Sequence, residues 1–205
     1  SKVFFQNNDD RQLFISAGLV SAAITDRLPG SGVDLAHFKP CPLPRRPLVK
    51  FLLIARMLWD KGIGEYVEAA RSLKRRGFDF ECYLLGSLDL KNSSGISQKQ
   101  INSWEAEGVV NHLGVSDDVR VEIAQVDCVV LPSYYPEGTP RSLLEAAAMA
   151  RPIVTTNSVG CRDVVEDGAN GYLCNPRDAN DLADKMERIL TMTLVERETM
   201  GRLGR

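Results

Sequence analysis

The feature that most constrains the fold of this chain is the alternation of short apolar runs with stretches of helical periodicity. The apolar runs have the length and composition of buried strands and occupy residues 49–55, 80–85, 127–131 and 153–156. Helical patterns occupy residues 64–75, 119–125 and 142–149. A last helix is expected after Asp178, which is a suitable N-cap residue. Its apolar face is formed by Leu182, Met186, Ile189 and Leu190.

Repeats of a strand followed by a helix are typical of a parallel sheet that is covered by helices on both faces. Because the crossovers of such sheets are almost always right-handed, we predict an α/β fold with a doubly wound, Rossmann-like sheet. The 205 residues suffice for a single domain. Prolines at positions 40, 42, 44 and 47 predict an extended connector over residues 39–47. Ligands of such sheets bind beyond the carboxyl ends of the strands, so the loops there are the candidate sites.

The composition argues against several classes of function. The net charge of −2 gives no reason to expect a nucleic-acid partner. No apolar stretch approaches the roughly 20 residues that span a bilayer, and polar residues interrupt positions 1–15, so we expect neither a membrane span nor a signal peptide. The five cysteines form no C-x-x-C pair, and neither histidine lies near a cysteine cluster. These patterns predict reduced thiols in a cytoplasmic protein that has no metal site.

Two loops carry glycines or cations at positions where a ligand is expected. Residues 28–34 hold Gly30 and Gly32 around a serine, which permits close approach of a ligand, although a plain turn is the simpler explanation. Arg56 and Lys61 follow the apolar run that ends at Ala55. An arginine fork and a compact lysine charge suit a diphosphate at that place. The alternative is a pair of solvated surface charges.

The third loop leads into the helix predicted at residues 142–149. Thr139 is a good N-cap residue and Pro140 a good first helical residue. The backbone N–H groups of Arg141 and Ser142 then have no partner inside the helix. Together with the helix dipole, they predict an anion site at this helix start.

Two carboxylates flank that helix start. Glu137 lies in the loop before it, and Glu145 lies roughly in the second turn. Carboxylates do not favour a phosphate, but they bind the hydroxyl groups of a sugar attached to one. The alternative is one acidic loop residue and one solvated helix glutamate.

The fourth loop, residues 111–118, can reach the edge of a base through its backbone. His112 and Asp118 form no obvious catalytic pair, and a lone histidine beside Leu113 is more often structural than reactive.

Taken together, these motifs resemble the donor-binding domain of retaining glycosyltransferases of family four (group 1), the C-terminal half of a GT-B fold. The resemblance extends from about residue 6 to residue 201. It is closest to bacterial enzymes of capsule, O-antigen and oligosaccharide assembly. The motifs that carry it are Phe5-Gln-Asn-x-Asp-Asp-Arg, Gly30-Ser-Gly-Val-Asp34, Arg56-x4-Lys61-Gly62, Leu131-Pro-Ser-Tyr, Glu137-x7-Glu145-Ala146, Pro152-Ile-Val-Thr-Thr and Gly168-x-Asn-Gly-Tyr-Leu173.

The resemblance implies a role for each candidate residue. Arg56 and Lys61 are expected to hold the diphosphate of a UDP-sugar and to neutralise the charge on the leaving UDP without a metal or other cofactor. Glu137 is expected to contact the donor sugar and, with the two cations, to form the catalytic set. The remaining binding positions are Glu145 at the ribose, the backbone of Gly138, Thr139 and Arg141 at the phosphates, Gly30 and Gly32 near the sugar, and Val115 at uracil.

The resemblance also implies partners that lie outside this chain. Members of the family have an acceptor domain first, so residues 1–20 are expected to be an inter-domain segment and the chain a fragment that is inactive alone. The donor is expected to be a UDP-N-acetylhexosamine, and the acceptor a glycan or a lipid-diphosphate-linked sugar that the missing half contacts, which can place the full protein at the inner face of the membrane. The alternatives are a UDP-sugar epimerase-like domain and a non-catalytic nucleotide-binding module.

Overall fold

The computed structural model describes residues 1–28, 30, 32–136 and 138–205. Over these residues the centre of the molecule is a six-stranded sheet with the order β5-β4-β3-β6-β7-β8. Every pairing in this sheet is parallel, which confirms the predicted fold class. The strands are β3 (Val49–Ile54), β4 (Phe80–Leu85), β5 (Asn111–His112), β6 (Cys128–Leu131), β7 (Ile153–Thr156) and β8 (Gly171–Cys174).

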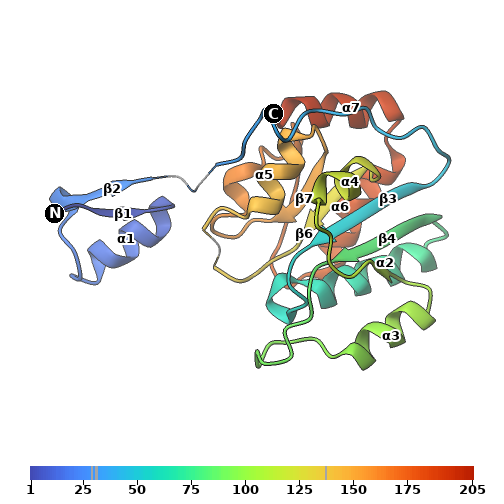
Figure 1. Cartoon of the computed structure of the whole chain (residues 1–205), viewed down its shortest axis with the longest axis horizontal. Helices are drawn as coiled ribbons and strands as arrows, with labels where there is room; N and C mark the ends of the chain where they lie inside the picture. Colours follow the sequence, from blue (N-terminus) through green and yellow to red (C-terminus); the bar gives the residue numbers. More distant parts are fainter. Residues whose placement is uncertain (29, 31, 137) are drawn as a thin grey trace.

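Helices cover both faces of the sheet (Figure 1). One face packs against α2 (Ile63–Arg75), α3 (Gln98–Ala106) and α6 (Ala179–Thr191). The other face packs against α4 (Val119–Ala124) and α5 (Arg141–Ala148). Each layer buries a separate apolar core, which is why the strands read as continuous apolar runs rather than alternating ones.

Most predicted elements are confirmed within one residue of their expected bounds, but several were missed. Asp178 caps α6 as predicted, since its carboxylate accepts hydrogen bonds from the N–H groups of Asn180 and Asp181. That helix is not the last, because α7 (Leu194–Leu203) follows and begins with a capping box between Thr193 and Glu196. Also missed were α3 and the strands β5 and β8.

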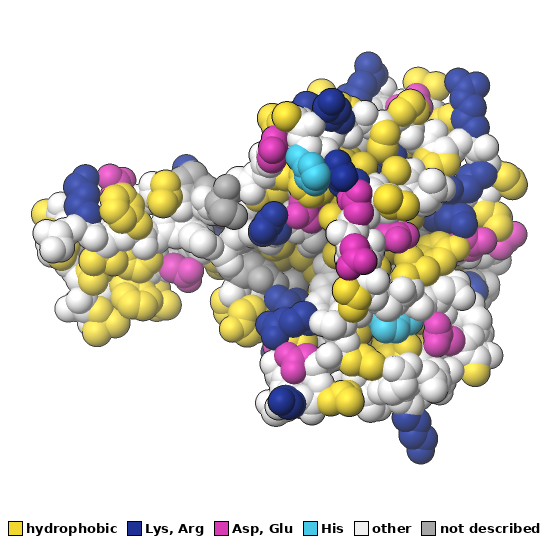
Figure 2. Space-filling view, in the orientation of Figure 1, with side chains coloured by type: hydrophobic (Ala, Val, Ile, Leu, Met, Phe, Trp, Pro, Cys, Tyr) yellow, Lys and Arg dark blue, Asp and Glu magenta, His cyan; other side chains and the backbone are white. Residues whose placement is uncertain are grey.

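The first 27 residues form a small unit of their own, here called the N-terminal unit. Its parallel strands β1 (Val3–Phe5) and β2 (Thr25–Arg27) pack with α1 (Asn8–Ser16) and are not hydrogen-bonded to the main sheet. Figure 1 shows this unit set apart from the rest of the molecule, here called the body, residues 38–205. Figure 2 shows apolar side chains on its surface. Its exposed large apolar residues are Val3, Phe4, Leu13, Phe14, Leu19 and Ile24.

The proline-rich connector runs along the body and is held by a buried arginine. Arg151 is fully buried, and its guanidinium donates to the backbone oxygens of Ile123 at 2.9 Å and Cys41 at 2.8 Å. Further donations go to the oxygens of Pro42 and Ala124, both at 3.3 Å. Burial lowers the pKa of Arg151. The connector therefore completes the hydrogen bonding of a cation inside the body.

A second buried charge ties the connector to the sheet. The Asp127 side chain is 2% exposed and accepts from the Arg46 guanidinium at 2.7 Å. It also accepts from the backbone N–H of Lys50 at 3.0 Å, and the Arg197 guanidinium lies 3.8 Å away. The carboxylate thus joins the connector, β3 and α7 at the amino end of β6.

Candidate functional site

The order of the strands creates the crevice in which a ligand is expected. The chain builds outward from β3 to β4 and β5, and then returns to place β6 on the other side of β3. The connections after β3 and β6 therefore leave the sheet in opposite directions, and a crevice opens between them at the carboxyl edge. Arg56 and Lys61 lie in the first connection. Thr139 and Arg141 lie in the second.

Both candidate cations lie at this edge, each beside a residue that sequence reasoning missed. The Arg56 side chain is 58% exposed and pairs with the Asp89 carboxylate, in the loop after β4, at 2.9 Å. The Lys61 ammonium lies 4.9 Å from the ring centroid of Tyr135, in the loop after β6. The cations are thus held at the crevice by flanking loops, and Asp89 and Tyr135 belong to the candidate site.

A clamp of backbone contacts joins the two connections. The short 3-10 helix η2 (Trp59–Lys61) presents the carbonyl oxygen of Asp60, which accepts from the N–H groups of Tyr134 at 3.1 Å and Tyr135 at 3.2 Å. Gly62 has a φ of 74°, and a Cβ added there would lie 2.1 Å from the carbonyl oxygen of Pro132. Only glycine allows this contact, so the position of Lys61 relative to the β6 connection is fixed by main-chain packing.

The start of α5 differs from the prediction. Thr139 is not the N-cap, because Pro140 occupies that position with φ −62° and ψ 120°, and within the described residues no side chain caps the helix. The fixed φ of proline and its extended ψ suit the cap, and its carbonyl oxygen accepts from the N–H of Leu143 at 3.1 Å. The helix begins at Arg141, so the N–H groups of Arg141 and Ser142 still lie in the first turn, as an anion site requires.

The two predicted carboxylates fare differently. Glu137 lies outside the described residues. The Glu145 side chain is 12% exposed and forms a 3.5 Å ion pair with Arg141, whose own side chain is 70% exposed. Burial raises the pKa of the Glu145 carboxyl, and the Arg141 charge opposes that shift. Glu145 is therefore on the side wall of the helix start, and the interpretation of it as a solvated surface residue is wrong.

The predicted glycine turn comes close to the α5 start. Gly30 has a φ of 52°, and a Cβ added to it would lie 3.4 Å from the Cβ of Thr139. A Cβ added to Gly138 would lie 1.7 Å from the side-chain Oε1 of Gln6, at the end of β1. The structure thus brings Gly30, Gly138 and Thr139 together and adds Gln6, while Gly32, with φ 69°, has open space around it.

The predicted base-binding loop follows the edge strand β5. Val115 is 71% exposed there, and the neighbouring carbonyl oxygen of Gly114 accepts from the N–H of Gly86 at 2.7 Å. That bond places the loop beside the carboxyl end of β4. The His112 ring nitrogen lies 2.9 Å from the carbonyl oxygen of Gly86, which supports a structural role for this histidine.

The cysteine thiols are mostly buried. None of the five forms a disulfide, and only Cys41 is partly exposed. Burial raises the pKa of the Cys82 and Cys174 thiols to about 12.

No helix in the part of the chain that the structure describes combines the length and the apolar character needed to cross a membrane.

The fold and the crevice define a doubly wound α/β domain with cations and a helix start at its ligand-binding edge. Residues 49–192 match the model of the family described as "Glycosyl transferases group 1". The chain therefore belongs to the group 1 glycosyltransferases, which confirms the resemblance seen in the sequence.

Relatives and solved structures agree with this assignment. The chain is 35% identical over 153 residues to the N,N'-diacetylbacillosaminyl-diphospho-undecaprenol alpha-1,3-N-acetylgalactosaminyltransferase of Campylobacter jejuni, covering 75% of this chain and 38% of that protein. It is 29% identical over 152 residues to the capsular polysaccharide biosynthesis glycosyltransferase CapM of Staphylococcus aureus, covering 74% of this chain and 39% of CapM. Anabaena Alr3699/HepE in complex with UDP and glucose superposes with a TM-score of 0.83 at 23% identity, covering 100% of this chain and 57% of that one. The chain thus spans about two fifths of the length of these curated relatives.

Proposed function

We propose that this chain is the donor-binding part of a retaining glycosyltransferase that uses a UDP-sugar, with a UDP-N-acetylhexosamine as the donor class. The observation that carries the proposal is the placement of Arg56 and Lys61 at the sheet crevice, with the start of α5 across it. Two comparisons support it. One structural neighbour binds UDP and glucose, and one relative is named for transfer of N-acetylgalactosamine to a diphospho-undecaprenol-linked sugar.

The chemical task assigned to this domain is stabilisation of the leaving UDP. Transfer breaks the bond between the anomeric carbon and the diphosphate, so negative charge grows on the phosphate oxygens. Preorganised cations and the N–H groups at a helix start stabilise that charge more than they stabilise the bound donor. Arg56 and Lys61 supply the cations, and the backbone of Arg141 and Ser142 supplies the N–H groups. With both in place, no metal or other cofactor is needed. Asp89 must release Arg56 when the diphosphate enters.

The carboxylates are assigned to the sugars. Glu145, on the side wall of the α5 start, is proposed to accept hydrogen bonds from the ribose hydroxyls. Glu137 is proposed to contact the donor sugar, and the loop at Val115 to meet uracil. The acceptor, a glycan or a lipid-diphosphate-linked sugar, is assigned to a further domain, so this chain alone is expected to bind UDP and to transfer little or no sugar.

Calorimetric titration with UDP tests the phosphate assignment. Loss of a charge-assisted hydrogen bond is expected to weaken UDP binding by about ten- to a hundredfold in Arg56→Ala and in Lys61→Ala. Arg75→Ala removes an exposed cation from the far end of α2 and is expected to bind UDP like the wild type. Unchanged affinity in both Arg56→Ala and Lys61→Ala would sink the assignment.

The sugar assignment is tested in the protein that carries the acceptor half. Glu137→Gln keeps the size of the side chain but removes its charge. The rate of transfer is expected to fall more than the affinity for UDP, because the glutamate contacts the sugar and not the nucleotide. An equal loss of both would show a structural role instead.

A further inference from the structure

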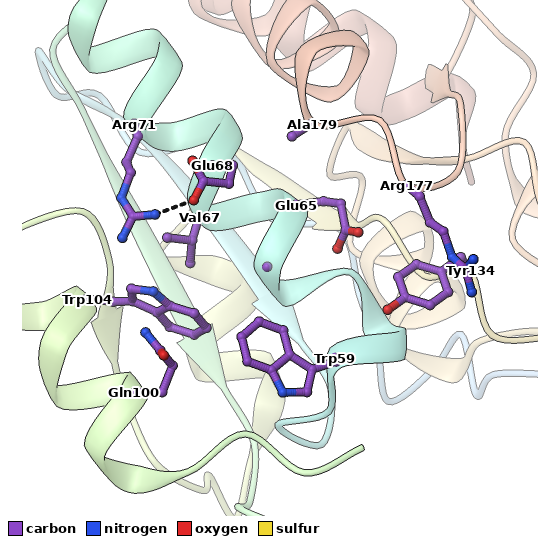
Figure 3. Close-up of a pocket in the computed structure, with 11 residues that line it drawn as sticks. Trp59, Glu65, Val67, Glu68, Arg71, Gln100, Trp104, Tyr134, Arg177 and Ala179 are labelled. Carbon is purple, nitrogen blue, oxygen red and sulfur yellow. Dashed lines mark hydrogen bonds and ion pairs between the residues drawn. The ribbon is translucent and has the colours of Figure 1, made fainter. Parts of the chain in front are cut away.

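A groove of about 500 Å³ lies on the outer side of α2, between α3 and the start of α6. Figure 3 shows its lining, which includes Trp59, Glu65, Arg71, Trp104 and Tyr134. The sugar–diphosphate assignments above do not use it.

The groove lies near the crevice that holds Lys61, because neighbouring residues take part in both. Tyr134 and Tyr135 are successive residues, and both donate their N–H groups to the Asp60 oxygen. Their rings have different cationic neighbours. The Tyr135 ring lies beside Lys61, 4.9 Å from its ammonium, whereas the Tyr134 ring lines the groove and stacks under the Arg177 guanidinium at 4.4 Å.

The floor of the groove is aromatic and half open. The rings of Trp59 and Trp104 meet edge to face, with centroids 5.7 Å apart and an interplanar angle of 87°. Trp104 is 3% exposed, so it belongs to the core, but Trp59 is 39% exposed. A Cβ added to Gly64 would lie 3.0 Å from the Trp59 ring, so the missing side chain lets the indole lie on α2. Packing accounts for Trp104, but part of the Trp59 side chain stays exposed.

The rim of the groove carries polar groups of different kinds. Arg71 is held by ion pairs with Glu68 and, at 2.6 Å, with Glu107. Within the described part of the chain, the Glu65 carboxylate has no ion-pair or hydrogen-bond partner. It lies close enough to Tyr134 to raise the pKa of that hydroxyl, as the second cause after burial. One carboxylate is therefore available as an acceptor, and its charge disfavours an anionic ligand.

We propose that this groove is a second binding site, for a neutral oligosaccharide. A pyranose ring has an apolar C–H face that stacks on an exposed indole, and its hydroxyls donate to carboxylates and accept from guanidinium and amide groups. Trp59 supplies the face, Glu65 and Glu68 the acceptors, and Arg71 and Gln100 the donors. The cavity volume falls in the roughly 300–1,000 Å³ range of small-ligand sites. The charge of Glu65 disfavours phosphates and nucleotides.

The chain offers a specific reporter for the test. It has two tryptophans, and both line the groove. Intrinsic fluorescence is measured while maltotriose or N,N′-diacetylchitobiose is added to the 205-residue protein, with glycerol at equal mass as the control for bulk effects. At least one saccharide is expected to give a saturable change in emission, while glycerol gives none.

Variants locate the binding. Trp59→Ala is expected to abolish the response. Glu65→Gln keeps both fluorophores and is expected to weaken binding about tenfold, through loss of a charged acceptor. Glu122→Gln, on α4 at the opposite face of the sheet, is the matched control and is expected to titrate like the wild type. The proposal is overturned if both saccharides give flat titrations, or if Glu65→Gln titrates like Glu122→Gln.

A last comparison separates this site from the donor crevice. Lys61→Ala is expected to lose UDP affinity and to keep the full saccharide response. If saturating UDP or the Lys61→Ala change removed that response, the saccharide would be binding in the crevice and a second site would be refuted. Saccharide binding in the groove can be refuted while UDP binding in the crevice is confirmed. Failure of this proposal is therefore distinguishable from failure of the proposed function.

Discussion

The N-terminal unit and the body are both built from strands and helices in alternation, but they bury their apolar side chains very differently. In α1, all of which the structure describes, no residue is buried, and the unit is held by an edge contact between Phe5 and Phe14 at 5.3 Å. In α2 the apolar stripe is covered by the sheet and by α6. The comparison shows that a strand–helix pattern buries its apolar side chains only where a second layer covers them.

The largest effect is expected where the body buries a charge. Asp127→Ala removes the carboxylate that pairs with Arg46 and accepts from the Lys50 N–H, although Arg46 still donates to the backbone oxygens of Leu48 and Gln125. Removal of one partner of a buried ion pair costs about 3–5 kcal/mol. Urea unfolding followed by tryptophan fluorescence measures this loss, since both tryptophans lie in the body. Asp184→Ala breaks an ion pair with Arg76 at the surface, where the Asp184 side chain is 61% exposed. This change is expected to cost about 0–1 kcal/mol. Equal losses in the two variants would contradict the difference drawn between buried and exposed charges.

The next effect concerns the clamp between the two site connections. Gly62→Ala and Gly77→Ala both place a Cβ at positive φ, 74° and 87°, which costs about 1–2 kcal/mol. Only Gly62 also has a backbone oxygen, that of Pro132, within 2.1 Å of the new Cβ, so a further loss of about 1–3 kcal/mol is expected there. The affinity for UDP should fall together with the stability in Gly62→Ala, and it should stay unchanged in Gly77→Ala. Matching behaviour of the two variants would show that the clamp does not fix Lys61.

The buried Glu145 carboxylate is expected to lower the stability of the body at neutral pH. Burial raises the pKa of its carboxyl above the ordinary value of 4.5, so the charged form is disfavoured in the folded state. The stability linked to this group is fully present below pH 4.5 and is lost as the pH rises through the folded-state pKa. Glu145→Gln should therefore raise the unfolding midpoint at pH 7 and leave it nearly unchanged at pH 4. If Glu145 contacts the ribose, the same variant should bind UDP about tenfold more weakly. A variant that is no more stable at pH 7 would show that the charge is well solvated.

The smallest effect is expected in the N-terminal unit. Phe4 is 57% exposed and Phe51 is fully buried in the body. Phe4→Ser should change the unfolding free energy of the body by less than about 0.5 kcal/mol, whereas Phe51→Ser should cost at least about 3 kcal/mol. A large effect of Phe4→Ser on the tryptophan-detected transition would show that the unit and the body unfold together.

The parts of the fold that could be predicted are those with a strong local signal. The strands β3 and β4 are buried on both faces, so their residues form continuous apolar runs, and Asp178 marks the start of α6 by its own chemistry. The helix α3 was missed because only Ile101 and Trp104 of its residues are buried, which leaves a largely polar sequence. β5 spans two residues and leaves no periodicity to detect.

The candidate site was predicted unevenly for a related reason. Arg56 and Lys61 could be found because cations directly after a buried strand are poorly explained by packing. Their neighbours Asp89 and Tyr135 lie on other loops, and only the tertiary fold brings them near. Thr139 was predicted as the N-cap of α5 because threonine favours that position. The fixed φ of Pro140 instead places the cap one residue later. The aromatic groove could not be predicted, because Trp59 and Trp104 are far apart in the sequence.

The buried Arg151 has a consequence for where this domain can be cut. The segment that matches the family model starts at residue 49, yet the backbone oxygens of Cys41 and Pro42 that accept from Arg151 come before it. A protein trimmed to the matched segment would keep the cation and lose half of its acceptors. The smallest piece that can be produced as a stable reagent therefore begins upstream of Cys41, at a boundary set by hydrogen bonding rather than by similarity.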